Sequence, residues 1–521
     1  MPALFPSVVQ LPEYNALALA PVVLVALGGL VCVLLEAFLP RRLRHQVELA
    51  VAVVALVAAF LVLALRETQM LGITMAGSVV MDGPTVVIQM LLLVLSLLAL
   101  IIMSERFGGR VADAFTSSGS AVPGSPMEGI AERRGTTTEI FPLTLFSVSG
   151  MMLFPAAGDL LTMFIALELL SLPLYVLTAL GRRRRLLSQE AALKYFLLGS
   201  FSSAFFLFGA ALLYGFAGSV QFGYIADRIA TVSGMDPLLW MGSLLVLVGL
   251  LFKVGAVPFH SWTPDVYQGA PTPVTGFMAA CTKVAAFGAL LRVGYTGIDA
   301  ARWDWQVVLW IIAGLTMILG SLLSVTQTDI KRMLAYSSIA HAGFILVGFL
   351  AFSTAAVGAV IFYLAAYGFA TIAAFGLVML VRATEDQSEA TSLTQWEGLG
   401  RRSPLVAGAF SFLLMAFAGI PLTSGFTAKF AVFGAAISGA GLPGVVLAVI
   451  GVLCSAVTAF VYFRVIWLMY FADPDGEAVT VFTPSVATVS AIALGVVITF
   501  ALGVFPTPLL DLTSASSLFL R

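Results

Sequence analysis

Apolar segments of about 20 residues recur along the chain from near Leu17 to Val504. A helix of that length crosses the roughly 30 Å of hydrocarbon in a bilayer. The segments are continuously apolar and do not alternate strictly over about ten residues, which favours membrane helices over a β-barrel. The pattern predicts an all-α integral membrane protein with about fourteen transmembrane helices.

The expected spans are residues 15–38, 47–65, 83–103, 139–158, 160–180, 190–215, 237–260, 272–296, 305–326, 333–352, 355–381, 404–438, 443–470 and 482–506. Composition agrees, since 60% of the residues are hydrophobic, 10% are charged and the mean hydropathy is +1.04. These values exclude a water-soluble globule with a polar shell.

The twelfth span is too long for one straight crossing, because about 40 helical residues would extend roughly 60 Å. Gly419–Gly425, which contains a proline, two glycines and two hydroxyl side chains, predicts a break into two half-helices, with Lys429 on the outer one. Val257–Ser261, at the end of the seventh span, resembles Ile420–Ser424 in the twelfth. An offset of five spans predicts two inverted five-helix repeats with broken helices 7 and 12.

This interpretation divides the chain into five parts. An N-terminal three-helix segment (1–103) and a loop insertion (104–138) precede the first antiporter-like repeat (139–296), the second repeat (305–470), and a C-terminal helix and tail (471–521). The loop is rich in Ser, Gly, Thr and charges, and is expected to be mobile and cytoplasmic.

Charge sets the expected orientation. Alternate connections, beginning with 41–46, contain most of the 26 Lys and Arg residues, so the positive-inside rule predicts that both termini face outward. The cluster Arg182–Arg185 is explained by orientation and lipid headgroups, with partner docking as the alternative. A net charge of −1 argues against binding to nucleic acid, and Cys32, Cys281 and Cys454 have no metal-ligand spacing.

Lysine placement is the main indication of chemistry. The chain has only five lysines, and Lys194, Lys253, Lys283 and Lys429 lie within apolar runs. A buried lysine, unlike an arginine, can lose its proton, and a charge at the bilayer centre is costly unless it has a partner, water or a function. A row of such lysines can therefore carry protons.

Glu168, near the middle of the fifth span, is the candidate partner of Lys253. A static ion pair between helices is one interpretation; the other is a coupled pair in which moving or hydrating one group changes the proton affinity of the other. His260 lies seven residues after Lys253, about two helical turns, and is predicted either to relay protons or to bind a loop carbonyl.

Lys283 and Lys429 are the deepest remaining lysines, and function explains both better than structure does. Lys194 lies in the first turns of its span, so it can either belong to the proton path or extend toward the headgroups. Structural roles are expected first for four other residues: packing for His341, with a proton relay as the alternative, extension to the headgroups for Arg292, and helix capping for Asp159 and Asp265.

Two long strings carry a family resemblance. Leu251–Val274 (LFKVGAVPFHSWTPDVYQGAPTPV) and Asp329–Gly343 (DIKRMLAYSSIAHAG) resemble the signatures of the antiporter-like membrane subunits of respiratory complex I. The resemblance runs from about residue 140 to about residue 471. Lys429, where the subunit M branch has glutamate, and a chain that stops soon after span fourteen favour a branch other than subunits M and L.

The resemblance implies the roles of individual residues. It identifies Glu168, Lys253, His260, Lys283 and Lys429 as proton-transfer groups, and Lys194 as an additional, less certain one. It also implies a subunit without cofactors of its own, with FMN, iron–sulfur clusters and quinone in partner subunits. Subunits K and M are the expected neighbours within the bilayer, and the peripheral arm is a further partner. The bias toward Arg, Ala, Gly and Val is typical of a GC-rich bacterium, which suggests menaquinone and the plasma membrane.

The expected function is proton translocation coupled to quinone reduction by NADH. Energy would pass along a polar axis in mid-membrane, alter the coupling of Glu168 to Lys253, and drive protons through Lys283 toward Lys429. Two alternatives remain open at this point: a subunit of a multi-component Na⁺/H⁺ antiporter or a membrane-bound hydrogenase, and a structural scaffold whose lysines are statically paired.

Overall fold

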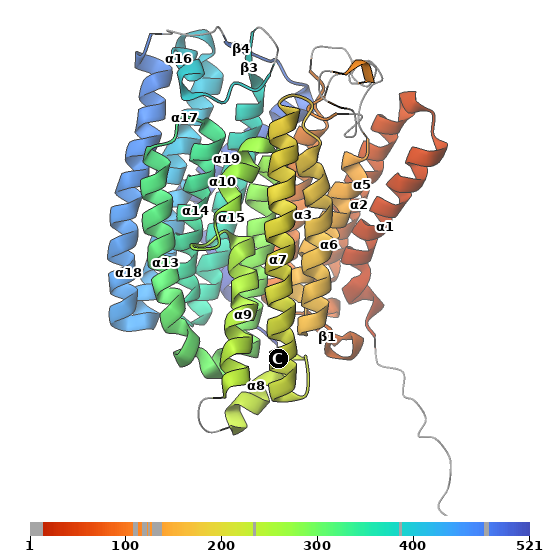
Figure 1. The fold of residues 1–521 in the computed structure, drawn as a ribbon, viewed down its shortest axis with the longest axis vertical. Coiled ribbons are helices and arrows are strands. Elements are labelled where there is room, and N and C mark those ends of the chain that lie inside the picture. The colour runs from red at the N-terminus through yellow and green to blue at the C-terminus, as the bar shows by residue number, and fades with distance from the viewer. Residues whose placement is uncertain are drawn as a thin grey trace, which may run out of the picture.

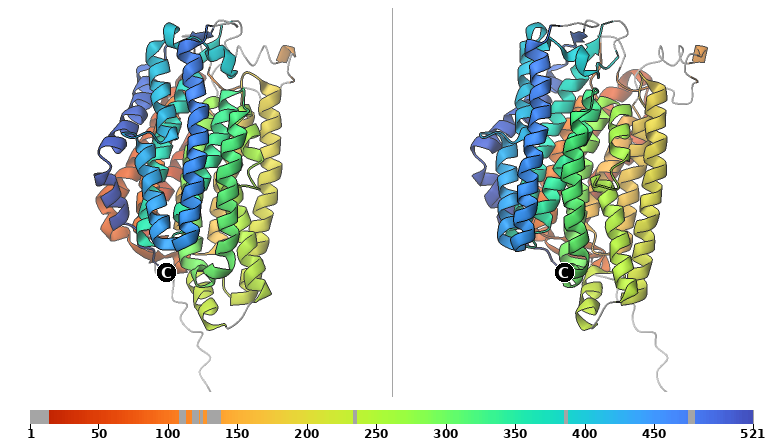
Figure 2. Two further views of the ribbon diagram at one scale, coloured as in Figure 1. Left: turned by 90° about the vertical axis from the view of Figure 1, so that its left-hand side faces the viewer. Right: turned by 60° about the vertical axis from the view of Figure 1, so that its left-hand side comes forward.

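The computed structural model describes residues 14–107, 113–116, 122, 125–127, 138–232, 236–384, 388–473 and 479–520. Over these ranges the chain is an elongated bundle of upright helices, as Figures 1 and 2 show. Twelve of the described helices are long and apolar enough to cross a membrane, and Ile140–Ala156 and Pro404–Ala418 are shorter apolar helices. The prediction of an all-α membrane protein is confirmed.

The first helices are α1 (Ala16–Phe38), α2 (Arg41–Met70) and α3 (Gly83–Met103), with the hairpin strands β1 (Gly72–Thr74) and β2 (Val79–Met81) flanking η1 (Met75–Gly77). The helices that correspond to the first predicted repeat are α5 (Ile140–Ala156), α6 (Leu160–Ala179), α7 (Arg185–Ala217), α8 (Phe222–Thr231), α9 (Pro237–Val254), α10 (Trp262–Gly269), α11 (Thr272–Phe277), η2 (Met278–Thr282), α12 (Lys283–Arg292) and η3 (Val293–Gly297).

The second set comprises η4 (Asp299–Ala301), α13 (Arg302–Val325), α14 (Ile330–Phe349), α15 (Thr354–Leu380), β3 (Val381–Ala383), η5 (Leu393–Trp396), α16 (Leu399–Arg402), α17 (Pro404–Ala418) and α18 (Ser424–Phe471). The chain continues with β4 (Val479–Val481), which pairs antiparallel with β3, and then α19 (Val486–Val504) and α20 (Thr507–Ala515).

The described chain begins and ends at the same end of the bundle. In Figure 1, α8, β1 and the C-terminus lie toward the lower end, whereas β3, β4 and α16 lie at the upper end. The upper end also contains the turn from α1 to α2, next to Arg41, Arg42 and Arg44. Arginines are therefore concentrated at one end of the bundle.

Both predicted breaks occur, and they have the same local geometry. Gly255 ends α9 with φ 81°, and Gly419 ends α17 with φ 83°, a left-handed conformation that glycine adopts without strain. The N–H groups of Gly255 and Ala256 both donate to the carbonyl of Leu251. Those of Gly419 and Ile420 donate to Met415 in the same way. This shared C-terminal capping motif agrees with the repeat predicted from the sequence.

The predicted end of the seventh span was wrong. The seventh span was expected to end at residue 260 and a loop was expected at 261–271, but the buried helix α10 fills most of that range. The error has a physical cause, because Trp262, Thr263, Pro264 and Asp265 lower the hydropathy of a segment that is buried by protein instead of lipid. The seventh span therefore breaks in its middle, between α9 and α10.

The loop insertion falls largely on residues outside the described ranges. One of its described stretches, residues 113–116, contacts the turn after α6: Phe115 is buried, and the N–H of Thr116 donates to the carbonyl of Leu180. Asp113 forms an ion pair with Arg182 at 2.7 Å.

The expectation that Arg292 extends to the headgroups is also wrong. Its guanidinium makes two bonds to the Asp82 carboxylate, of 2.7 and 2.8 Å, and only 1% and 2% of the two side chains are exposed. Asp82 also caps α3 and accepts a bond from the N–H of Leu520. Residues 82 and 292 are far apart in the sequence, so no local pattern could reveal this pair. It joins α3, α12 and the C-terminal segment.

This geometry predicts that Asp82→Ala lowers stability by about 3 to 5 kcal/mol, because it leaves a buried guanidinium unpaired. The measurement is the thermal unfolding of the purified protein in detergent. The matched control is Asp473→Ala, which removes an exposed ion pair with Arg401 and should cost about 1 kcal/mol or less. Equal melting of the two variants would contradict this account of the buried pair.

Candidate functional site

Lys253 lies in the last turn of α9 and is 4% exposed. Its ammonium donates to the Ser171 hydroxyl on α6 at 2.8 Å and to the Tyr195 hydroxyl on α7 at 3.1 Å. It also lies 5.1 Å from the centre of the Tyr195 ring. Neutral oxygens and an aromatic face therefore surround this cation.

Glu168 lies one helical turn before Ser171 on α6. Its Oε1 is buried without a hydrogen-bond partner, and no ion pair joins it to Lys253 in the described part of the chain. The carboxylate acts on the ammonium electrostatically across a gap. The two predicted partners are close enough to influence each other but are not in direct contact.

Lys283 begins α12, directly after the π-helical segment η2, and is itself 3% exposed in a span that is buried over nearly its whole length. Such π segments occur frequently at functional sites. Its ammonium donates to the carbonyl and the hydroxyl of Ser338 on α14 and lies 5.2 Å from the Tyr367 ring centre. No carboxylate pairs with it among the described residues.

Lys429 follows the break between α17 and α18, as predicted, and its ammonium reaches back to the end of α17. It donates to the carbonyls of Phe417 at 3.0 Å and Ala418 at 2.8 Å, and to the Ser455 hydroxyl at 2.6 Å. The C-terminal end of a helix carries a partial negative charge. The helix break therefore supplies the counter-charge that a carboxylate would otherwise provide.

His341 lies between the last two lysines. Its Nδ1 is 2.7 Å from the Tyr363 hydroxyl, and its ring contacts Tyr367 and Phe344. The Tyr367 ring adjoins Lys283, and the Phe344 ring adjoins Lys429. His341 packs among aromatic rings, as expected, and it also lies between Lys283 and Lys429, a position that the sequence did not predict. One feature of the sequence could have indicated this position: Ser338, a polar residue, lies one helical turn before His341 in the same motif.

His260 occupies the break between α9 and α10, and its Nδ1 is buried without a hydrogen-bond partner among the described residues. Gly255 ends α9 between Lys253 and His260, so the spacing of seven residues does not correspond to two continuous helical turns. Trp262, at the start of α10, connects the two halves. Its indole N–H donates to the Phe252 carbonyl, and its ring stacks on Tyr195 at 4.8 Å.

Lys194 lies apart from this row, with 43% of its side chain exposed. It forms ion pairs with Glu190 at 2.7 Å and Asp265 at 2.8 Å. Asp265, which was expected to cap a helix, instead pairs with Lys194 and with Arg332 on α14 at 2.6 Å. Asp159 does cap α6, as predicted.

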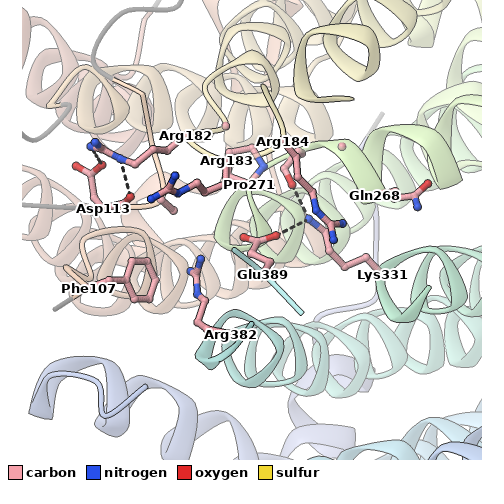
Figure 3. A pocket seen from close by; sticks show the side chains of 14 residues that line it. Phe107, Asp113, Arg182, Arg183, Arg184, Gln268, Pro271, Lys331, Arg382 and Glu389 are labelled. Atoms are coloured by element: carbon pink, nitrogen blue, oxygen red, sulfur yellow. Dashed lines mark hydrogen bonds and ion pairs between the residues drawn. The ribbon is translucent and has the colours of Figure 1, made fainter. Parts of the chain in front are cut away.

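A second charged cluster holds the upper end of α10, around the cavity shown in Figure 3. Lys331 donates to the Ala270 carbonyl at 2.6 Å and pairs with Glu389 at 3.1 Å. Burial alone would raise the pKa of Glu389, but the charges of Lys331 and Arg382 and the N–H of Thr272 outweigh it and lower that pKa to about 2. The start of α14 is therefore held against the end of α10 and the start of α11.

Among the described residues, no three His, Cys, Asp or Glu side chains are grouped so that they could bind a metal ion. The arrangement suits proton exchange instead, because lysines and histidines alternate with hydroxyl groups within a buried row.

Comparison with known proteins agrees with this geometry. The family model described as NADH:quinone oxidoreductase/Mrp antiporter, TM matches residues 157–458. NADH-quinone oxidoreductase subunit N of Rhodococcus opacus is 52% identical over 99% of this chain and 98% of its own length. The subunit N of Salinispora arenicola is 53% identical over 99% and 100%.

Solved structures give the same result. A chain of respiratory complex I from Thermus thermophilus with bound aureothin superposes with a TM-score of 0.75 at 32% identity, covering 95% of this chain and 99% of its own. A chain of the Mrp complex from a Dietzia strain has a TM-score of 0.78 at 21% identity, covering 96% and 97%, and shares the fold.

The lowered pKa of Glu389 makes the stability of the protein depend on pH. Because its folded-state pKa is lowered, Glu389 contributes stability above its ordinary pKa of about 4.3, and that contribution disappears as the pH falls toward 2. Glu389→Gln should therefore cost up to roughly 3 kcal/mol at pH 7 and progressively less below about pH 4.5. Melting of the purified complex as a function of pH measures this, with Glu190→Gln as an exposed control. A loss of stability in Glu389→Gln that stays the same at every pH would contradict this role of the Glu389 carboxylate.

Proposed function

Since the chain belongs to the NADH:quinone oxidoreductase/Mrp antiporter family, as a subunit N type membrane subunit of respiratory complex I, we propose that its buried basic row carries the protons that the complex translocates. The observation that supports this most is that Lys253, Lys283 and Lys429 are all buried and all bound by neutral oxygens. An ammonium without a bound carboxylate can release its proton at a cost that small movements or hydration can change.

The route begins at Glu168 and Lys253. A change in the distance or hydration between these two groups alters the electrostatic support for the Lys253 ammonium, so it acts as the switch. Lys283 is the central carrier, His341 bridges toward the second repeat, and Lys429 is the exit group. His260, in the break next to Lys253, is a relay to the first lysine.

The arrangement of helices supports this order. Tyr195 contacts both Lys253 and Trp262. The ring centres of Trp262 and Tyr267 lie 6.3 Å apart. A buried aromatic layer thus connects α7 and α9 with α10. Water between these rings would join the hydroxyl groups of Ser171, Tyr195 and Ser338 into a conducting line.

Orientation and partners complete the proposal. The arginine-rich end faces the cytoplasm of a bacterium and both termini face outward, as the positive-inside pattern supports. Subunits K and M flank the chain, and FMN, the iron–sulfur clusters and the quinone site belong to other subunits. Hydrophobic side chains exposed on α1, α7, α13 and α18 are suited to lipid and to such neighbours.

Lys253→Arg is the sharpest test, because arginine keeps the positive charge but does not release its proton. In complex reconstituted into vesicles, pumping coupled to NADH oxidation should fall by roughly tenfold or more. Lys253→Ala and Glu168→Ala should also impair pumping. Lys194→Arg is the matched control, because the ion pairs with Glu190 and Asp265 need only a positive charge.

A static scaffold predicts the opposite pattern. In that case Lys253→Arg would leave pumping intact in assembled complex, and lysine loss would affect assembly alone. Native gels on the same preparations separate assembly from turnover. A normal proton-to-electron ratio in both Lys253→Ala and Glu168→Ala would overturn the proposed route.

A further inference from the structure

A second titratable site lies outside both repeats, at the upper end of α1 and α2. Glu48 on α2 is 0% exposed, and neither oxygen of its carboxyl group has a hydrogen-bond partner among the described residues. An ionised carboxylate in such a position costs several kcal/mol, because no partner replaces the water that it has lost. Among the described residues of the N-terminal three-helix segment, Glu48 therefore has the most deeply buried carboxyl group without a hydrogen-bond partner.

Glu36 on α1 is an acidic neighbour whose carboxyl group acts on that of Glu48. The oxygens of Glu36 accept bonds from the Arg44 guanidinium and the Thr138 hydroxyl. Arg44 therefore pairs directly with Glu36, and for Glu48 it supplies only a weaker attraction through space. About a quarter of the Glu36 and Arg44 side chains is exposed, so they connect the buried acid with the surface of the bundle.

The remaining groups around Glu48 do not supply a positive partner. On α1, the Cys32 thiol donates to the backbone carbonyl of Glu48. Before α5, Glu139 adds a second negative charge that opposes ionisation. On α2, His45 lies one turn earlier with its ring against Phe141, and Arg106, after α3, lies near His45.

We propose that Glu48 is a proton-binding site, separate from the lysine row, that exchanges its proton with water at the arginine-rich end of the bundle through Glu36. The proton binds one carboxyl oxygen of Glu48 and leaves toward the partly exposed Glu36 and Arg44. No other bond forms or breaks. Two carboxyl groups this close cannot both be ionised easily, so the one without a cation holds the proton.

Other buried acids in the chain show what a purely structural role looks like. Asp82 is held by the two nitrogens of Arg292, and Glu105, 6% exposed, accepts bonds from the N–H of Ser485 at 3.0 Å and its hydroxyl at 2.6 Å. Both are compensated by donors. Glu48 has no such donor within the described residues, which distinguishes a proton site from a structural carboxylate.

Dicyclohexylcarbodiimide tests the protonation state in the intact purified complex. A protonated carboxyl adds its O–H across one C=N bond of the reagent, and the acyl group then moves to nitrogen, which gives a stable N-acylurea with no leaving group. Peptide mass spectrometry at pH 7 should find this adduct on Glu48 and not on Asp82 or Glu105. Glu48→Gln, which mimics the protonated form in shape and charge, should assemble normally and lose the label.

Infrared spectroscopy decides the outcome if the reagent cannot reach the site. The wild-type complex should show a carboxylic acid carbonyl band that Glu48→Gln lacks, and this band should shift after transfer to D₂O. In Glu36→Gln the shift should be at least several-fold slower. Loss of an ionised carboxylate band in Glu48→Gln would overturn the site, and an unchanged rate in Glu36→Gln would overturn the exchange route. Neither result depends on whether the lysine row pumps.

Discussion

The burial of lysine ammonium groups without bound carboxylates is the constraint on which the rest of this structure depends. Each ammonium is held by hydroxyl or carbonyl oxygens and an aromatic face, contacts that are individually weak but sufficient in a medium of low dielectric constant. A carboxylate in direct contact would fix the charge in place. Glu168 influences the charge of Lys253 through space, and no ion pair joins the two among the described residues.

Broken helices make this arrangement possible. A continuous helix presents no free carbonyls in the middle of a membrane, whereas a helix that ends at Gly419 exposes the carbonyls of Phe417 and Ala418 to Lys429. The break at Gly255 has another effect: it admits α10, whose Trp262 contacts both α9 and Tyr195 on α7. Lys331 pairs with Glu389, and Arg332 pairs with Asp265. These ion pairs hold α10 and the start of α11 against α14.

Much of this could be predicted from the sequence, because long apolar runs, prolines beside glycines and lysines within apolar runs are local signals. They predicted the spans, both breaks and the positions of the buried lysines. Contacts between distant segments were not predictable. The Asp82–Arg292 pair, the position of His341 between two lysines and the isolation of Glu48 all depend on which helices pack together. The helix α10 escaped detection because its burial comes from protein neighbours, which a hydropathy pattern does not register.

The most direct test of the central claim is a structure of the complex at a resolution that shows ordered water around the basic row. The account predicts water molecules that join Lys253, Lys283, His341 and Lys429 through the hydroxyl groups of Tyr195 and Ser338 in at least one functional state. It also predicts a change in the gap between Glu168 and Lys253 between states. A row that stays dry in every state, with a fixed gap, would contradict it.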